Sequence, residues 1–234
     1  MLNNLIPNVI EYFPELIKAL KETLIMVSVS GLFSTVLGLP IGVILVVTSK
    51  GHILENSKVY SVVSKIVNTL RSIPFVILIA SIPNLTRAIV GTTIGVKGAI
   101  VPLVIACVPF VARQIELALL KVDMGVIEAY ESMGFTPMKI IRKVILIEGR
   151  KEVVLAITIS LISLIGFSAI TGTVGGGGLG DFAIRYGYQY FKSDIMVVTI
   201  IVIIAIILVV AAIFREQLTA AVTTVFENLT DFIG

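Results

Sequence analysis

Charged residues are scarce in this chain. Asp, Glu, Lys and Arg make up 14% of its 234 residues, whereas hydrophobic residues make up 57%. Soluble domains carry about 25% charged residues, and a globular core of this size could not bury so large an apolar excess. The composition therefore excludes a soluble protein and predicts an integral membrane protein.

Cysteine and histidine are nearly absent as well. The single cysteine, Cys107, excludes an intrachain disulfide and a cysteine-based zinc site, and the single histidine, His52, excludes a multi-histidine metal site within one chain. The sequence also lacks the Gly-x-x-x-x-Gly-Lys-Ser/Thr pattern of a phosphate-binding loop, so we expect no ATP hydrolysis by this chain. A scattered net charge of +3 does not indicate nucleic-acid binding. We therefore expect neither an enzyme nor a metal or cofactor site.

Long apolar runs are abundant, and a helix needs about 20 mostly apolar residues to cross a bilayer. We predict an all-α integral membrane protein, residues 1–234 as a single domain, with five transmembrane helices. Residues 5–20 are amphipathic and predict a helix at the membrane surface before the first span. The approximate spans are 23–48, 66–86, 88–112, 153–173 and 195–214.

Basic residues set the expected orientation. Eleven Lys and Arg residues lie after the first, third and fifth spans, against six on the other side of the membrane. Because Lys and Arg collect in cytoplasmic loops, we expect the N-terminus outside and the C-terminus in the cytoplasm. The lipid of a cell membrane is then the solvent of the five spans.

The longest polar stretch lies between the third and fourth spans and contains a predicted coupling segment, residues 121–150. Residues 125–133 have the mixture of a short amphipathic helix, and Gly134 suits a left-handed helix cap. Thr136 and Pro137 are residue types that begin a second helix. Two helices joined by a glycine predict a rigid cytoplasmic elbow that suits docking to another protein. The alternative is a basic loop against anionic lipid heads.

The elbow carries a known pattern. Glu128-Ala129-Tyr130-x-x-x-Gly134, followed by Val144-Ile145-Leu146, resembles the EAA loop of bacterial ABC-importer permeases. More narrowly, residues 133–140, the glycine-rich segment 175–188 and Arg71-Ser72-Ile73-Pro74-Phe75 resemble the methionine-importer permease family. Two residues depart from the pattern: Tyr130 replaces the second alanine of the triplet, and Ile147 stands where a proline usually closes the motif. Residues 216–234 match no role in the family.

The resemblance implies a permease subunit of an ATP-driven importer in a bacterial inner membrane. Such a subunit carries methionine or a related small amino acid by alternating access, as a homodimer with two copies of an ABC ATPase subunit and an extracytoplasmic substrate-binding protein. The alternative is a passive channel or an unpowered secondary transporter for a small solute. The resemblance assigns ATPase coupling to Glu128, Ala129, Tyr130, Gly134, Thr136 and Pro137.

Polar residues inside the apolar runs are candidates for a translocation path. Arg71 either anchors its helix near the surface or has a functional role, because charge inside a membrane is costly. The glycine run 172–180 predicts a flexible end of the fourth span with close backbone packing, rather than a substrate site. Hydroxyl side chains in the fourth span either pack helices together or line a weakly polar path; they are Ser160, Ser163, Ser168 and Thr171.

Overall fold

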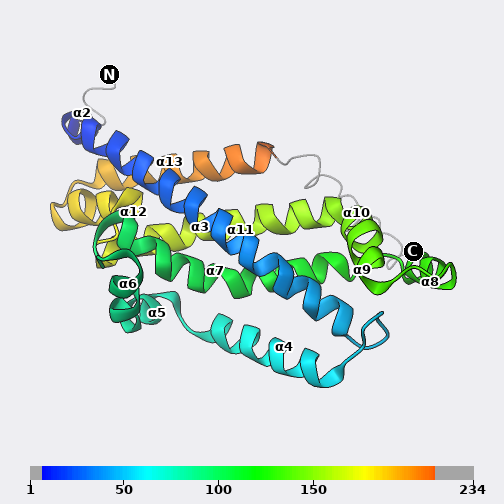
Figure 1. Ribbon diagram of the computed structural model, residues 1–234. Helices are drawn as coiled ribbons and strands as arrows, with labels where there is room; N and C mark the ends of the chain where they lie inside the picture. Colours follow the sequence, from blue (N-terminus) through cyan, green and yellow to red (C-terminus); the bar gives the residue numbers. More distant parts are fainter. Residues whose placement is uncertain (1–6, 214–234) are drawn as a thin grey trace, which may run out of the picture.

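The structure, a computed structural model, describes residues 7–213, and every regular element within them is helical (Figure 1). This confirms the all-α membrane class. Within residues 7–213, four helices are long and apolar enough to cross a membrane, or five if the bent pair α4 (Ser57–Ser72) and α5 (Phe75–Ser81) is one span. The four are α3 (Phe13–Thr48), α7 (Gly95–Leu119), α11 (Arg150–Thr171) and α13 (Ser193–Ile213).

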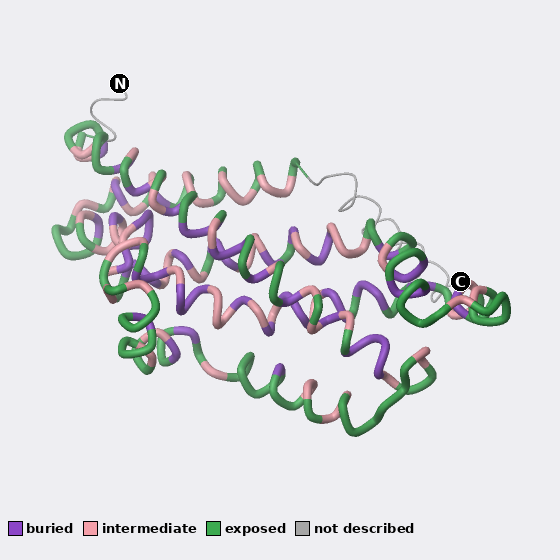
Figure 2. Tube along the Cα trace, in the orientation of Figure 1, coloured by how far each residue is buried: buried purple, intermediate pink, exposed green. Residues whose placement is uncertain are grey.

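The core lies where α3 crosses α7 and where α7 meets α11. Gly42 of α3 faces α7 so closely that a Cβ atom there would lie 2.7 Å from the carbonyl oxygen of Ala112 and from the Cβ of Ile115. Small residues allow transmembrane helices this approach. Buried residues concentrate along these three helices, whereas α4 is mostly exposed and α13 has few buried residues, Ile195 and Thr199 (Figure 2).

The second expected span, 66–86, is not one helix. α4 ends at Ser72, the chain bends by 95°, and α5 is followed by α6 (Pro83–Val90). Pro74 causes the break because it offers no backbone N–H and holds Ile73 in extended geometry, at φ −76° and ψ 122°. α4 also begins before residue 66, since the Asn56 side chain accepts hydrogen bonds from the backbone N–H groups of Lys58 and Val59.

Other boundaries shift for local reasons. The third expected span, 88–112, is the helix α7, which starts at Gly95 because Gly91 ends α6 in the left-handed conformation, at φ +77°. The expected surface helix, 5–20, is divided between α2 (Pro7–Glu11) and the first turns of α3. The spans expected at 153–173 and 195–214 correspond to α11 and α13. Residue 214 and the tail 216–234 lie outside the described residues.

Short helices close both ends of the bundle (Figure 1). We call the end with α8 (Met124–Ser132), α9 (Pro137–Ile140), the π-helix η1 (Ile141–Ile145) and α10 (Leu146–Glu148) the elbow end. The opposite end holds α2, α6 and the segment that joins α11 to α13. That segment comprises the 3-10 helix η2 (Gly172–Val174), α12 (Gly178–Phe182) and the π-helix η3 (Ala183–Gln189).

Candidate functional site

The first arm of the elbow is α8, which has one buried and one exposed side. Asp123 caps the helix by accepting a hydrogen bond of 2.7 Å from the backbone N–H of Gly125. Ile127 is fully buried in the main hydrophobic core, whereas Glu128 and Ala129 are exposed. The core contact fixes the helix, and Glu128 and Ala129, two of the six residues that the resemblance assigned to coupling, lie on its exposed side.

The turn after α8 depends on Gly134. Its φ of +78° is in the left-handed region that favours glycine, and a Cβ atom there would meet nothing within 4 Å. The Gly134 N–H donates to the carbonyl oxygen of Glu131 at 2.8 Å. Tyr130 packs edge-on against Phe135 across the turn, with ring centroids 5.2 Å apart. The glycine thus acts through its backbone conformation, and an aromatic pair braces the turn.

The second arm of the elbow, α9, begins at the expected residues but without the expected capping hydrogen bond. Thr136 is the N-cap and Pro137 the first helical residue of α9, yet the Thr136 hydroxyl makes no capping hydrogen bond. Its carbonyl oxygen accepts from the backbone N–H groups of Lys139 and Ile140, at 2.9 and 3.1 Å. The helix then widens into η1 at Ile141, so the regular helix predicted here is interrupted by a π-turn.

The elbow is fastened to the membrane-spanning helices. Ile145 is fully buried, and Gly149 lies so close to α7 that a Cβ atom would come 2.6 Å from the Leu119 side chain. Lys121, just after α7, forms an ion pair of 2.7 Å with Glu152 of α11. The elbow is therefore in direct contact with the end of α7, which is itself joined to α11 by the ion pair.

The free surface of the elbow mixes apolar and charged side chains. Met133, Met138 and Ile147 are 61, 56 and 47% exposed, beside the exposed basic residues Lys139 and Arg142. Apolar patches rimmed by polar residues are typical of protein-interaction sites. Of the two departures from the family pattern, Tyr130 is half-buried against Phe135 and Ile147 lies on this surface.

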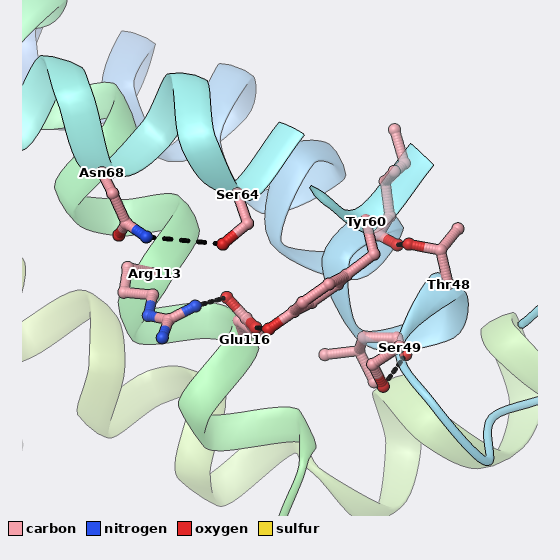
Figure 3. Close-up of polar contacts among 9 residues, drawn as sticks. Thr48, Ser49, Tyr60, Ser64, Asn68, Arg113 and Glu116 are labelled. Carbon is pink, nitrogen blue, oxygen red and sulfur yellow. Dashed lines mark hydrogen bonds and ion pairs between the residues drawn. The ribbon is translucent and has the colours of Figure 1, made fainter. Parts of the chain in front are cut away.

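Near the elbow end, α4 and α7 are joined by a polar network that the sequence analysis missed (Figure 3). Glu116 of α7 is 1% exposed. It accepts hydrogen bonds from the Tyr60 hydroxyl of α4 at 3.1 Å and from the Arg113 guanidinium at 2.6 Å. The Arg113-x-x-Glu116 spacing, one helical turn apart beside an apolar run, was the available signal. The Arg113 guanidinium offsets the charge of the buried Glu116 carboxylate, and the hydrogen bond from Tyr60 connects α4 to α7.

At the opposite end, the glycine run is packed against the bundle. The backbone N–H groups of Gly178 and Leu179 donate to the Glu22 carboxylate and the Thr23 hydroxyl of α3, both at 2.8 Å. A Cβ atom at Gly180 would overlap the carbonyl oxygen of Ala169 in α11, and one at Gly172 would overlap the backbone of Asp181. These glycines permit backbone contact.

The hydroxyl candidates in α11 bond within their own helix. Ser160, Ser168 and Thr171 are buried and donate to carbonyl oxygens three or four residues earlier, and Ser163, half-buried, does the same. Arg71 lies at the end of α4 instead, exposed, with its guanidinium carbon 5.6 Å from the centre of the Phe110 ring. The structure thus does not bring Arg71 and the buried hydroxyls into one site.

A membrane bundle with an elbow that is anchored in the core on one side and exposed on the other defines the membrane subunit of a transport complex. The comparison with protein families agrees with this class. The chain belongs to the family of binding-protein-dependent transport system inner membrane components, whose model matches residues 23–223. The resemblance to importer permeases is therefore confirmed.

Individual relatives and a solved structure show which members of the family the chain resembles. The chain is 49% identical to the probable D-methionine transport system permease protein MetI of Vibrio cholerae, over 79% of this chain and 82% of that protein. It is 52% identical to the D-methionine transport system permease protein MetI of Escherichia coli, over 67 and 72% of the two chains. An inward-facing structure of the MetNI methionine ABC transporter matches with a TM-score of 0.82 and 45% identity, covering 88% of this chain and 98% of that one.

Proposed function

We propose that this chain is the permease subunit of an ATP-driven importer that carries methionine or a related small amino acid across a bacterial inner membrane. Two copies of the chain form the permease, and two copies of a separate ABC ATPase bind their elbows. An extracytoplasmic binding protein delivers the amino acid at the opposite end. The permease itself is not catalytic.

The observation that carries this proposal is the elbow, fixed on its inner side and free on its outer side. Ile127 and Ile145 anchor it in the core, and Glu128 and Ala129 remain exposed for a partner. Close likeness to proteins named as methionine permeases supports the substrate. Likeness to a chain of the MetNI transporter supports a separate ATPase.

The proposed coupling mechanism follows from the contacts between the elbow and the membrane-spanning helices. Closure of the two ATPase subunits on ATP moves the two elbows. The contact of Gly149 with Leu119 passes that movement to α7, and the Lys121–Glu152 ion pair links the end of α7 to α11. A partner can drive such a change only if it binds the two conformations with different affinities. Glu128, Ala129 and the Gly134 turn are therefore the contacts that must differ between the two states.

The elbow end is assigned to the cytoplasm. This assignment rests on the excess of Lys and Arg in the segments that lie there. α3 begins at the opposite end (Figure 1), so the same proposal has the N-terminal side of α3 outside.

The test is uptake of labelled L- and D-methionine into proteoliposomes that contain this chain, its ATPase and its binding protein, with ATP on the elbow side. We expect accumulation against the gradient that stops when a non-hydrolysable ATP analogue replaces ATP. Equilibration without ATP would instead support a passive channel. ATP hydrolysis without methionine accumulation would keep the importer and reject the substrate.

A further inference from the structure

Helix α4 has three distinct faces. Its inner face, formed by Tyr60, Val63 and Val67, packs on a small core cluster with Leu45 of α3 and Ala112 of α7. A second face is apolar and exposed, with Val59, Val62, Ile66 and Leu70. At 100° per residue, the remaining side forms a polar arc, which we define as Ser57, Ser61, Ser64, Lys65, Asn68 and Ser72.

A helix that contacts only lipid would not carry exposed polar side chains such as those of the polar arc. Four of its six residues are exposed in the single chain, and Ser61 and Ser64 are half-buried. α4 runs alongside α3 and α7 between the elbow end and the bundle's middle (Figure 1). Its 16 residues span about 24 Å, most of a hydrocarbon core of about 30 Å. Polar side chains at that depth require water or a polar partner.

The arc ends at a charge and a helix break. Arg71 is the last basic residue of α4, immediately before the 95° bend, and it lies at the level of Phe110 near the middle of α7. Among residues 7–213 no carboxylate pairs with Arg71, whereas Arg113 is satisfied by Glu116 at 2.6 Å. Discontinuous helices near the membrane centre are where transporters bind substrate. An unpaired guanidinium there is positioned for an anion.

On α7, the Arg113 side chain is partly exposed, at 27%, whereas Glu116 is buried. Figure 3 draws Ser64 and Asn68 on α4, with a hydrogen bond of 3.4 Å from Asn68 to Ser64, and Arg113 and Glu116 on α7. The buried hydroxyls of α11 offer no such surface, because their hydrogens are already donated to their own helix. The exposed polar side chains between the helix break and the elbow end therefore lie on α4.

We propose that the polar arc lines the elbow-side half of a water-filled translocation path, and that Arg71 binds the carboxylate of the amino acid in transit. This rests on the proposed function. A guanidinium binds a carboxylate through two parallel charge-assisted hydrogen bonds. The hydroxyl and amide groups that follow offer weak, repeated contacts, which let a zwitterion pass without being trapped. Lys65 continues the positive charge toward the elbow end.

Thiol accessibility tests the path. The native Cys107 is 1% exposed, so the unmodified chain serves as the unlabelled background. Asn68→Cys and Ser61→Cys place a thiol on the arc, and Val62→Cys and Ile66→Cys place one at similar depth on the exposed apolar face. The assembled permease–ATPase complex in proteoliposomes is treated with a charged, membrane-impermeant methanethiosulfonate reagent from the elbow side. We expect the arc thiols to react at least tenfold faster than the apolar-face thiols.

Protection by substrate tests Arg71. L-Methionine should slow modification of Asn68→Cys severalfold. It should protect less when Arg71→Lys is added, because an ammonium keeps the charge but not the two parallel hydrogen bonds, and should lose its effect when Arg71→Gln is added. Methionine amide, which lacks the carboxylate, should not protect. Equal protection in the Arg71→Gln background overturns the carboxylate role.

Two further outcomes separate this inference from the proposed function. Arc thiols that react no faster than the controls, or that cross-link to a second copy while transport continues, overturn the water-filled path and indicate a protein interface. Reactive arc thiols in a complex that neither accumulates nor binds methionine keep the path but reject methionine as the substrate, and overturn the methionine-binding role of Arg71 with it.

Discussion

Both ends of the bundle depend on glycine residues, for opposite reasons. At the elbow end Gly134 has open space around it and is required for its φ of +78°. At the opposite end Gly180 has no such conformation, but a Cβ atom would overlap the backbone of α11. The elbow leaves Glu128 and Ala129 exposed, whereas at the opposite end Glu22 and Thr23 accept hydrogen bonds from the backbone of the glycine run. Glycine therefore permits a left-handed turn in one place and close helix packing in the other.

The largest expected effect is at the opposite end. Gly180→Ala forces α12 away from Ala169, and we expect a loss of about 3 kcal/mol, the upper part of the overpacking range, with a Tm lower by roughly 6–12 °C. Thermal unfolding of the purified chain in detergent measures this. Gly166→Ala is the matched control, because a Cβ atom there meets nothing within 4 Å. An unchanged Tm for Gly180→Ala would contradict the packing role.

At the elbow, a substitution should impair function and leave the bundle intact. Gly134→Pro cannot adopt the left-handed conformation and loses the N–H that donates to Glu131. We expect ATP-driven uptake to fall at least tenfold while membrane insertion and Tm stay close to those of the unmodified chain. Gly134→Asn, which tolerates the left-handed region, should retain most uptake. Normal uptake by the proline variant would remove the elbow from coupling.

Near the elbow end, too, a buried polar group has partners within the chain: the Glu116 carboxylate accepts hydrogen bonds from Tyr60 and Arg113. Tyr60→Phe removes one of two hydrogen bonds to Glu116 and leaves Arg113 in place. We expect a loss of about 1 kcal/mol, which is a Tm lower by roughly 2–4 °C. Ser64→Ala changes a neighbouring exposed contact on the same helix and should leave Tm unchanged. Equal Tm values for the two variants would show that the Tyr60 hydrogen bond adds nothing.

The smallest expected effect is a pH dependence from the loop between α3 and α4. Burial lowers the pKa of His52 from its usual 6.5, so folding favours the neutral ring and His52 adds stability above pH 6.5 that is lost as pH falls through its lower folded pKa. Between pH 7.5 and pH 5.0 the unmodified chain should therefore lose more Tm than His52→Gln. A parallel loss in both would exclude His52 as the cause.

Much of this protein was predictable because membrane and motif signals are local. Apolar runs predict helices of membrane length, since lipid cannot hydrogen-bond to a backbone, and α3, α11 and α13 follow from them. The elbow was predictable because Gly134 and Pro137 act on backbone angles within a turn. The break after α4 was missed, although Pro74 was visible, because an apolar run of the right length outweighed one proline.

The membrane class, the helical content and the position of the elbow follow from the amino-acid sequence, because they depend on composition, on backbone preferences and on a motif a few residues long. Which polar groups meet depends on the packing of the helices. Tyr60 and Glu116 are 56 residues apart in the chain, and Glu22 reaches Gly178 across 156. No spacing encodes such contacts, because they depend on how α3, α4 and α7 pack. The same packing buries the hydroxyls of α11 and leaves the polar arc of α4 uncovered.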